Sequence, residues 1–156
     1  MSDDASRRGD MSTRLARLAA DGRLTIDSVG PGRFHLAGQR VDGGILLTPS
    51  GWRSWPIDSL DGIEPTSLIA ALSGLGGADV LLIGCGARLD ASPAGLVAAL
   101  RKAGQIADVM ATAPASRSYN LMASEGRRVA AALMALPVDG ASAAPDKKEA
   151  GPEGPA

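Results

Sequence analysis

Between residues 23 and 56, hydrophobic and polar residues alternate with a period of two, a pattern typical of β-strands with one buried face. Leu24 to Val29 alternates in this way, and RFHLA at 33–37 repeats the pattern after a turn at Gly-Pro-Gly 30–32. Asp42-Gly43 is a strong hairpin signal before the strand GILLTP. With a fourth short strand in GWRSWPI, this half of the chain predicts a β-meander.

From Pro65 onward, the pattern changes to helices separated by apolar strands. The first helix is expected to begin at Pro65, which suits a first turn, and to end at the glycines in 74–77. The second is expected to be capped by Ser92, with Pro93 in its first turn, and to end at Gly104. These boundaries predict two helices of ordinary length.

Two apolar runs and a third helix complete the predicted domain. DVLLIG at 79–84 is apolar on both faces, as expected for a strand covered on both sides, and IADVM at 106–110 is expected to be a second inner strand. The third helix is predicted from Thr112, as its cap, to about Leu136. Its expected apolar stripe consists of Met122, Val129, Leu133 and Leu136. A β-meander followed by α-β-α-β-α predicts an α/β domain with a mixed central sheet.

The two ends of the chain have a different composition. Residues 1–22 are polar and are expected to form a flexible arm, with Met11 as an alternative start to Met1. Residues 137–156 are rich in Pro, Gly, Ala and charge and are expected to be disordered. The folded domain is therefore expected at 23–136. The sequence contains no apolar stretch long enough to cross a bilayer and no secretory signal, so we expect a cytoplasmic protein, with peripheral association with the inner membrane as an extension of that expectation.

Charge and composition narrow the classes of function. The formal net charge is −1 and aromatic residues make up 3% of the chain, which argues against nucleic-acid binding through a basic field or base stacking. Cys85 is the single cysteine and His35 the single histidine, so we expect neither a metal site nor another cofactor. His35 alternates away from Phe34 and Leu36, which favours a surface or structural role over a catalytic one.

The stretch LLIGCGARLD at 81–90 raises the question of a nucleotide-binding loop. Gly84 and Gly86 match the glycines at the first and third positions of the dinucleotide fingerprint, but the sixth position is Leu89. The next helix opens only near Pro93, too late for its amides to hold a pyrophosphate beside the glycines. We interpret the glycines as a turn that ends a buried strand, in which Cys85 needs only to be small.

Loops after neighbouring parallel strands are nevertheless common ligand sites. The loops Gly84–Arg88 and Ala111–Arg117 could bring the two arginines to one crevice, suited to a carboxylate or phosphate. The alternative is that each arginine pairs with a local acid or lies on the surface. Asp90 and Asp108 are candidate bases by proximity only, so no catalytic residue is assigned and an enzyme is weakly supported.

Three segments together resemble a known family: LLIGCGAR, the strand ADVM, and TAPASRSYNLMASEGRRVAAAL from Thr112. They are similar to the Mth938-like family, a domain of unknown function whose eukaryotic members include a mitochondrial complex I assembly factor. The resemblance runs from about Leu24 to Leu136 and includes GRFHLAG, GGILLTP and Trp55. Relatives carry an alanine and a threonine where this chain has Pro114 and Ser118. The motif positions that match are Gly84, Gly86, Thr112, Arg117, Tyr119 and Asn120.

The resemblance implies a compact three-layer α/β domain without established catalytic residues. It favours a non-catalytic interaction protein, such as an assembly factor for a membrane respiratory complex of the complex I type, whose partners are respiratory-complex or export-machinery subunits. The alternative is a protein that binds a small anionic ligand, or an enzyme, with its crevice at the carboxyl ends of strands 80–84 and 107–110. Candidate binding residues under either hypothesis are Gly84, Cys85, Gly86, Arg88, Thr112, Arg117, Tyr119 and Asn120.

Overall fold

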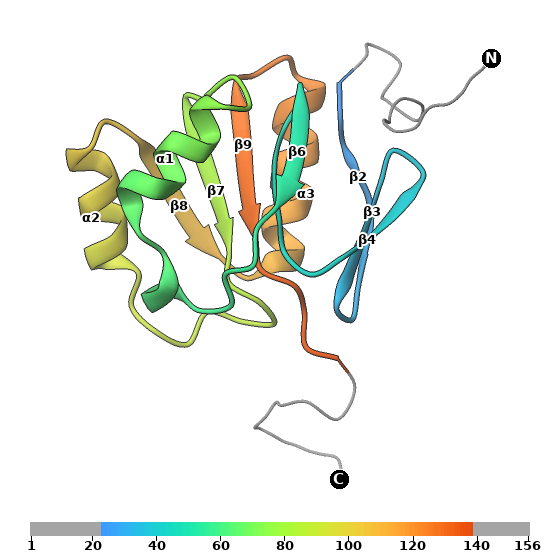
Figure 1. Cartoon of the computed structure of the whole chain (residues 1–156), viewed down its shortest axis with the longest axis horizontal. Coiled ribbons are helices and arrows are strands. Elements are labelled where there is room, and N and C mark those ends of the chain that lie inside the picture. Colours follow the sequence, from blue (N-terminus) through green and yellow to red (C-terminus); the bar gives the residue numbers. More distant parts are fainter. Residues whose placement is uncertain (1–22, 139–156) are drawn as a thin grey trace, which may run out of the picture.

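The computed structural model describes residues 23–138, in which two β-sheets and three α-helices form three layers (Figure 1). The predicted arm, 1–22, and all but the first two residues of the predicted tail lie outside the described residues. The strands are β2 (Ile26–Gly30), β3 (Arg33–Leu36), β4 (Gln39–Asp42), β5 (Ile45–Thr48), β6 (Gly51–Ser54), β7 (Val80–Gly84), β8 (Ile106–Met110) and β9 (Val129–Leu133). The helices are α1 (Pro65–Ser73), α2 (Ala94–Lys102), α3 (Thr112–Ser124) and the short 3-10 helix η1 (Leu60–Gly62).

The larger sheet has five strands in the order β6-β5-β9-β7-β8. β7 runs parallel to β8 and β9, whereas β5 runs antiparallel to β6 and β9, so the sheet is mixed, as predicted. α1 and α2 cover one face, where Leu72 and Leu100 pack against Leu81 and Ile83 of β7. All five residues of β9 are buried at the centre of the sheet.

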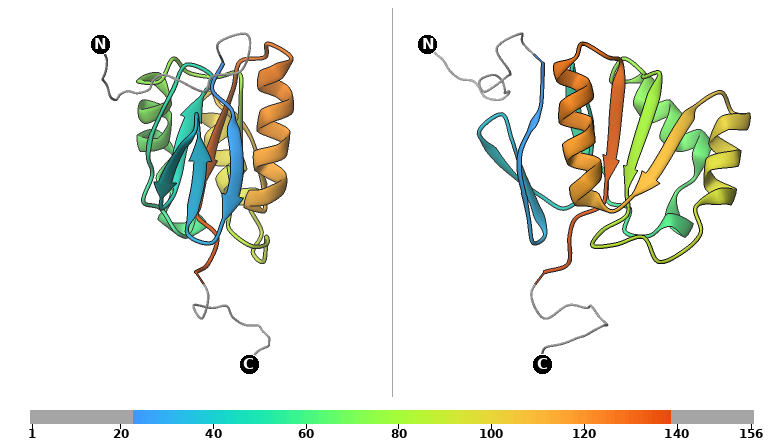
Figure 2. Two further views of the ribbon diagram at one scale, coloured as in Figure 1. Left: turned by 90° about the vertical axis from the view of Figure 1, so that its right-hand side faces the viewer. Right: turned by 180° about the vertical axis from the view of Figure 1, so that it is seen from behind.

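The smaller sheet, β2-β3-β4, is antiparallel and lies with α3 on the opposite face of the larger sheet (Figure 2). Buried and more exposed side chains alternate along β3, as the period-two pattern predicts, whereas the register of β2 shifts between Ile26 and Ser28. Phe34, Leu36 and Val41 are buried and join a core that includes Tyr119 of α3. The order of layers is therefore two helices, the large sheet, and then α3 beside the small sheet.

The predicted course of the last helix is wrong. α3 ends at Ser124, and part of its expected second half is the central strand β9. Gly126, with φ +80°, ends the helix, and the Arg127 N–H donates to the Met122 carbonyl over 3.1 Å, the bond typical of a glycine C-cap. Glu125-Gly126 is the stop signal that the prediction missed.

The hairpin predicted at Asp42-Gly43 is also absent. β4 ends in the small sheet and β5 begins in the large one, so this segment carries the chain between layers. The hairpin turn lies instead at Ala37-Gly38, whose φ angles of 51° and 79° are both positive. Because alanine rarely adopts positive φ, the sequence gives no turn signal there. The Gly38 N–H donates to the Asp27 carboxylate over 3.0 Å, which holds the turn in place.

The parallel neighbours β7 and β8 are the pair that the crevice hypothesis requires. β8, however, is an edge strand and not the inner strand expected from IADVM, and Ile106 is 55% exposed. The predicted start of α1 at Pro65 is confirmed, with Glu64 accepting hydrogen bonds from the Thr66 and Ser67 amides. α2 begins at Ala94, one residue later than a Pro93 start would place it.

Candidate functional site

The Gly-Cys-Gly turn and the first residue of α3 form one hydrogen-bonded unit. The Gly86 N–H donates to Thr112 Oγ1 over 2.8 Å, and the Thr112 N–H donates to the Gly86 carbonyl over 2.8 Å. The Thr112 hydroxyl in turn donates to the Met134 carbonyl over 2.7 Å, and the Cys85 N–H donates to the Met110 carbonyl over 2.9 Å. Thr112 does not cap α3, because Ala111 occupies that position; it joins the end of β7 to the segment that follows β9.

The glycines of this turn are required by space and by backbone conformation. A Cβ at Gly84 would lie 2.8 Å from the Thr112 Cα and 2.9 Å from the Leu133 Cδ2, so a side chain does not fit. Gly86 has a φ of +97°, which favours glycine. Since the amides of Cys85, Gly86 and Thr112 all donate within the domain, they are not available to cradle a phosphate.

Tyr119 and Asn120 attach β2 to α3. The Tyr119 hydroxyl donates to the Leu24 carbonyl over 2.7 Å. The Asn120 side chain accepts from the Ile26 N–H and donates to the Ile26 carbonyl, both over 2.8 Å, and so imitates a strand at the edge of β2. Tyr119 is fully buried, and this burial raises the pKa of its hydroxyl well above the usual range. Both residues therefore have a structural role, which is to hold the start of the small sheet against α3.

Arg88 and Cys85 have local partners. Arg88 Nε lies 3.6 Å from the Asp90 carboxylate, with both side chains 69% exposed, so this arginine pairs with a local acid. The Cys85 thiol donates to the Arg88 carbonyl over 3.5 Å. Burial and, to a smaller extent, Asp90 raise the pKa of Cys85, which makes the thiol a poor nucleophile at neutral pH. Asp108 is exposed on β8.

Arg117 is exposed on α3, and its side chain forms no hydrogen bond or ion pair with the part of the chain that the structure describes. The loop that carries Arg88 leads into α2, which covers the opposite face of the large sheet from α3. Arg88 lies beside Asp90, and Arg117 is the exposed cation of the motif, so the convergence of the two arginines on one crevice stays a prediction.

The sequence predicted a surface or structural role for His35 and gave no indication of its neighbours. His35 Nδ1 lies 3.2 Å from the Ser28 hydroxyl oxygen, and the ring is half-buried. Arg33 and Arg40 share its face of the small sheet, because Arg33 alternates with the buried Phe34 and Arg40 with the buried Val41. The same alternation that identified the core could have identified this group.

None of the helices within residues 23–138 is sufficiently long and apolar to pass through a lipid bilayer. Over that span, no three His, Cys, Asp or Glu residues are grouped so that they could hold a metal ion.

Comparison with known proteins gives three findings. The family described as "Protein of unknown function (DUF498/DUF598)" matches residues 26–134. An uncharacterised protein of Rhodobacter capsulatus is 40% identical over 116 residues, 74% of this chain and 88% of that protein. NADH dehydrogenase (ubiquinone) 1 alpha subcomplex assembly factor 3 of Danio rerio is 30% identical over 126 residues, 81% of this chain and 72% of that protein.

The fold also matches solved structures. The solution structure of a Bordetella pertussis protein described as an Mth938-like domain superposes with a TM-score of 0.62 at 27% identity, over 78% of this chain and 92% of that one. The likeness confirms the predicted α/β class with a mixed central sheet.

Proposed function

We propose, from the premise that this chain belongs to the DUF498/DUF598 family of Mth938-like domains, that it is a non-catalytic interaction domain assisting assembly of a membrane respiratory complex. Its partners would be protein subunits of an NADH dehydrogenase of the complex I type. It would meet them in the cytoplasm, at the inner membrane.

The proposal is supported by the contacts that the motif residues make within the domain. Thr112, Tyr119 and Asn120 bond to backbone groups of their own domain, at distances of 2.7 to 2.8 Å. A catalytic site needs a nucleophile or base that reaches a substrate, together with donors aimed at the developing charge. Arg117 is the member of the six-residue motif whose charged side chain meets solvent, and a solvent-facing arginine is suited to contact with another macromolecule.

The relatives supply the identity of the complex. The Danio rerio relative carries the name of an NADH dehydrogenase assembly factor, and this chain matches 72% of its length. The match extends over most of the described domain, which contains both the motif and the small sheet. We extend the assembly role to this chain on that basis, with export-machinery subunits as the other class of partner.

The test is deletion of the gene in its own cell, followed by blue-native electrophoresis of the membranes and measurement of their NADH oxidation. Loss of the assembled dehydrogenase, restored by a plasmid copy of the wild-type chain, is the expected result. Unchanged amounts of assembled enzyme in the deletion strain would refute the assembly role.

A second arm asks whether Arg117 takes part. Arg117→Ala is compared with Arg101→Ala, which removes the same charge from an exposed position in the last turn of α2. We expect the first variant to restore less dehydrogenase than the second. Tyr119 is kept intact in both, because replacing a fully buried side chain would test folding and not contact.

A further inference from the structure

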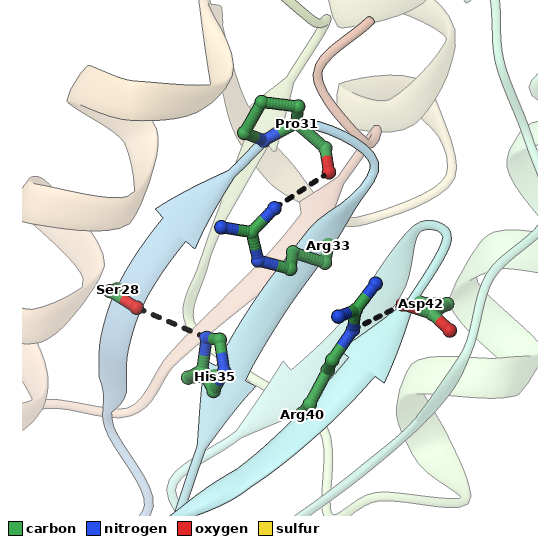
Figure 3. A network of polar contacts seen from close by, with 6 residues as sticks. All are labelled: Ser28, Pro31, Arg33, His35, Arg40 and Asp42. Atoms are coloured by element: carbon green, nitrogen blue, oxygen red, sulfur yellow. Dashed lines mark hydrogen bonds and ion pairs between the residues drawn. The ribbon is translucent and has the colours of Figure 1, made fainter. Parts of the chain in front are cut away.

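The outer side of the small sheet, which faces away from the large sheet (Figure 2), carries a row of basic side chains (Figure 3). His35 stands opposite Ser28 on one neighbouring strand and Arg40 on the other. Arg33 stands two residues from His35 on the same strand and so on the same face. Cross-strand neighbours on one face have Cβ atoms about 5 Å apart, so these side chains form a continuous group.

The Arg33 guanidinium lies over Gly30, where the absence of a side chain leaves space for it. A Cβ at Gly30 would lie 2.8 Å from the Arg33 Cζ and 2.9 Å from Nη2, so the guanidinium occupies the space that a side chain would fill. Its Nη1 donates to the Pro31 carbonyl over 3.3 Å (Figure 3). A positioned guanidinium loses less conformational entropy when it binds an anion than a freely rotating one.

This face has three arginines and two nearby acids, so an excess of positive charge remains on it. Asp42 lies 2.9 Å from Arg40 Nε, in a pair whose side chains are 73% and 62% exposed. Asp27 accepts a hydrogen bond from the Gly38 N–H. Arg33 has no carboxylate partner among the described residues, and an exposed pair such as Arg40–Asp42 is weak enough to exchange for another carboxylate.

Arg117 extends the group from β2 onto α3. Asn120 points to β2. Going around α3 away from the buried Tyr119, Arg117 lies about 60° beyond Asn120, on the flank that faces solvent beside β2. α3 runs opposite to β2, since Thr112 bonds near the β2–β3 turn end of the domain and Asn120 bonds to Ile26 at the start of β2. Three residues before Asn120, Arg117 is therefore level with the residues that follow Ile26. The left view of Figure 2 shows α3 beside β2 along one face.

We propose that this surface, the basic face formed by Arg33, His35, Arg40 and Arg117, binds an acidic segment of a partner protein. The inference rests on the proposed function and names the surface through which the domain holds its partner. Guanidinium groups spaced along the strands form paired hydrogen bonds with Asp or Glu carboxylates, and the Ser28 hydroxyl and His35 ring add polar contacts between them.

Charge density and chemistry favour a protein over other anionic partners. Binding to an anionic membrane surface takes clusters of about four to eight Lys or Arg residues, whereas this face has three arginines and two nearby acids. Nucleic-acid bases are held on aromatic side chains, but Phe34, Trp55 and Tyr119 are buried and Trp52 packs against the core. Separate carboxylates on a polypeptide fit three separated guanidiniums.

The test uses the purified full chain and hexaglutamate as the probe, with amide chemical shifts measured by NMR during titration. Shift changes are expected at β2, β3, β4 and the neighbouring flank of α3, and they should vanish at about 0.5 M salt. Arg33→Gln with Arg40→Gln should weaken binding about tenfold, from the loss of two charge pairs. The control, Arg101→Gln with Lys102→Gln, removes the same charge from the end of α2 and should change binding less than about twofold.

Gly30→Ala tests the position of the Arg33 guanidinium separately from its charge. Its φ does not lie in the left-handed region, so alanine is tolerated by the backbone while its Cβ displaces the Arg33 guanidinium. We expect about threefold weaker hexaglutamate binding with no loss of charge. Gly51→Ala, whose Cβ would meet only a Leu75 methyl at 3.7 Å, is the matched control and should bind as wild type does.

Several outcomes would overturn the proposal. It is refuted by equal weakening in both double variants, by shift changes confined to other surfaces, or by no binding. Vesicles of phosphatidylglycerol and phosphatidylcholine, and inorganic phosphate, are titrated in parallel, and preference for either over hexaglutamate would assign the face to lipid or phosphate instead.

The same double variants tested in the deletion strain separate this proposal from the function. If both restore the dehydrogenase, the basic face is wrong while the assembly role stands. If the deletion itself has no effect on assembly, the assembly role fails and the binding result is judged on the NMR titration alone.

Discussion

Replacing Thr112 by Val should destabilise the domain more than any change of similar size on its surface. The two side chains have nearly the same shape, so the substitution removes the hydroxyl and leaves the packing. In the wild type this hydroxyl accepts from the Gly86 N–H over 2.8 Å and donates to the Met134 carbonyl over 2.7 Å, and the Thr112 side chain is fully buried. Valine would leave both backbone groups without this partner.

The size of the destabilisation follows from the two backbone groups that lose their hydrogen-bond partner. A buried donor or acceptor that loses its partner costs about 1 to 3 kcal/mol, so the pair should cost about 3 kcal/mol in the free energy of unfolding. Small domains have a total stability of about 5 to 15 kcal/mol, so this is a large fraction. With a urea m-value of about 1.5 kcal/mol/M, the unfolding midpoint should fall by about 2 M.

The assay is urea unfolding followed by the fluorescence of the two tryptophans, of which Trp55 is buried. Thr112→Ser keeps the hydroxyl and loses one methyl group, and it should cost only about 1 kcal/mol. If Thr112→Val were as stable as Thr112→Ser within about 0.5 kcal/mol, the hydroxyl would not join the strand ends, and the structural role assigned to the motif would be wrong.

Three further predictions test other parts of the domain. Tyr119 is the single tyrosine, and burial raises its pKa, so its contribution to folding stability is present below its ordinary pKa of 10.0 and is lost as the pH rises above that value. Phenolate absorbance should therefore appear only together with unfolding. Ionisation near pH 10 in the folded protein would contradict the burial of Tyr119. Hydrogen bonds from the Ser67 hydroxyl and amide and from the Thr66 amide hold the pKa of Glu64 below 4.5, so its contribution to folding stability is present above that value and is lost as the pH falls through the folded-state pKa. Glu64→Gln should therefore flatten the pH dependence of the melting temperature in that acid range. An unchanged slope would argue against Glu64 as the cap of α1. Gly95→Ala on exposed α2, where an added Cβ meets nothing within 4 Å, should raise stability by about 0.5 kcal/mol in urea unfolding, and a loss of stability would indicate an unrecognised contact.

The parts of the fold that the sequence predicted well have strong local signals. Pro65 at the start of α1, the turn after Gly30 and the apolar run of β7 each carry a residue type that fixes the backbone or burial. β9 was missed because VAAAL offers little strand propensity and no alternation, and because alanines also suit the helix before it. Its central place depends on pairing with β5 and β7, which no local pattern records.

The candidate site could be located from the sequence only through resemblance, because its contacts are distant along the chain. Tyr119 reaches Leu24 across 95 positions, and Asn120 reaches Ile26 across 94. Spacing alone could not distinguish a tyrosine and asparagine that hold a strand from a pair that binds a ligand. In contrast, the alternation of Arg33 and His35 with buried residues was visible locally, but its meaning depended on which strands lie beside β3.

The fold-holding residues and the basic face are connected through β2. Asn120 fixes the start of β2 against α3, and this attachment sets Arg117 beside the strand that carries Ser28. The other edge of β2 pairs with β3, which carries Arg33 and His35. Loss of the Asn120 contacts would therefore separate Arg117 from the sheet arginines without removing any charge. The motif combines buried or partly buried residues with one exposed arginine, and its structural members determine the spacing at which the exposed charges meet a partner.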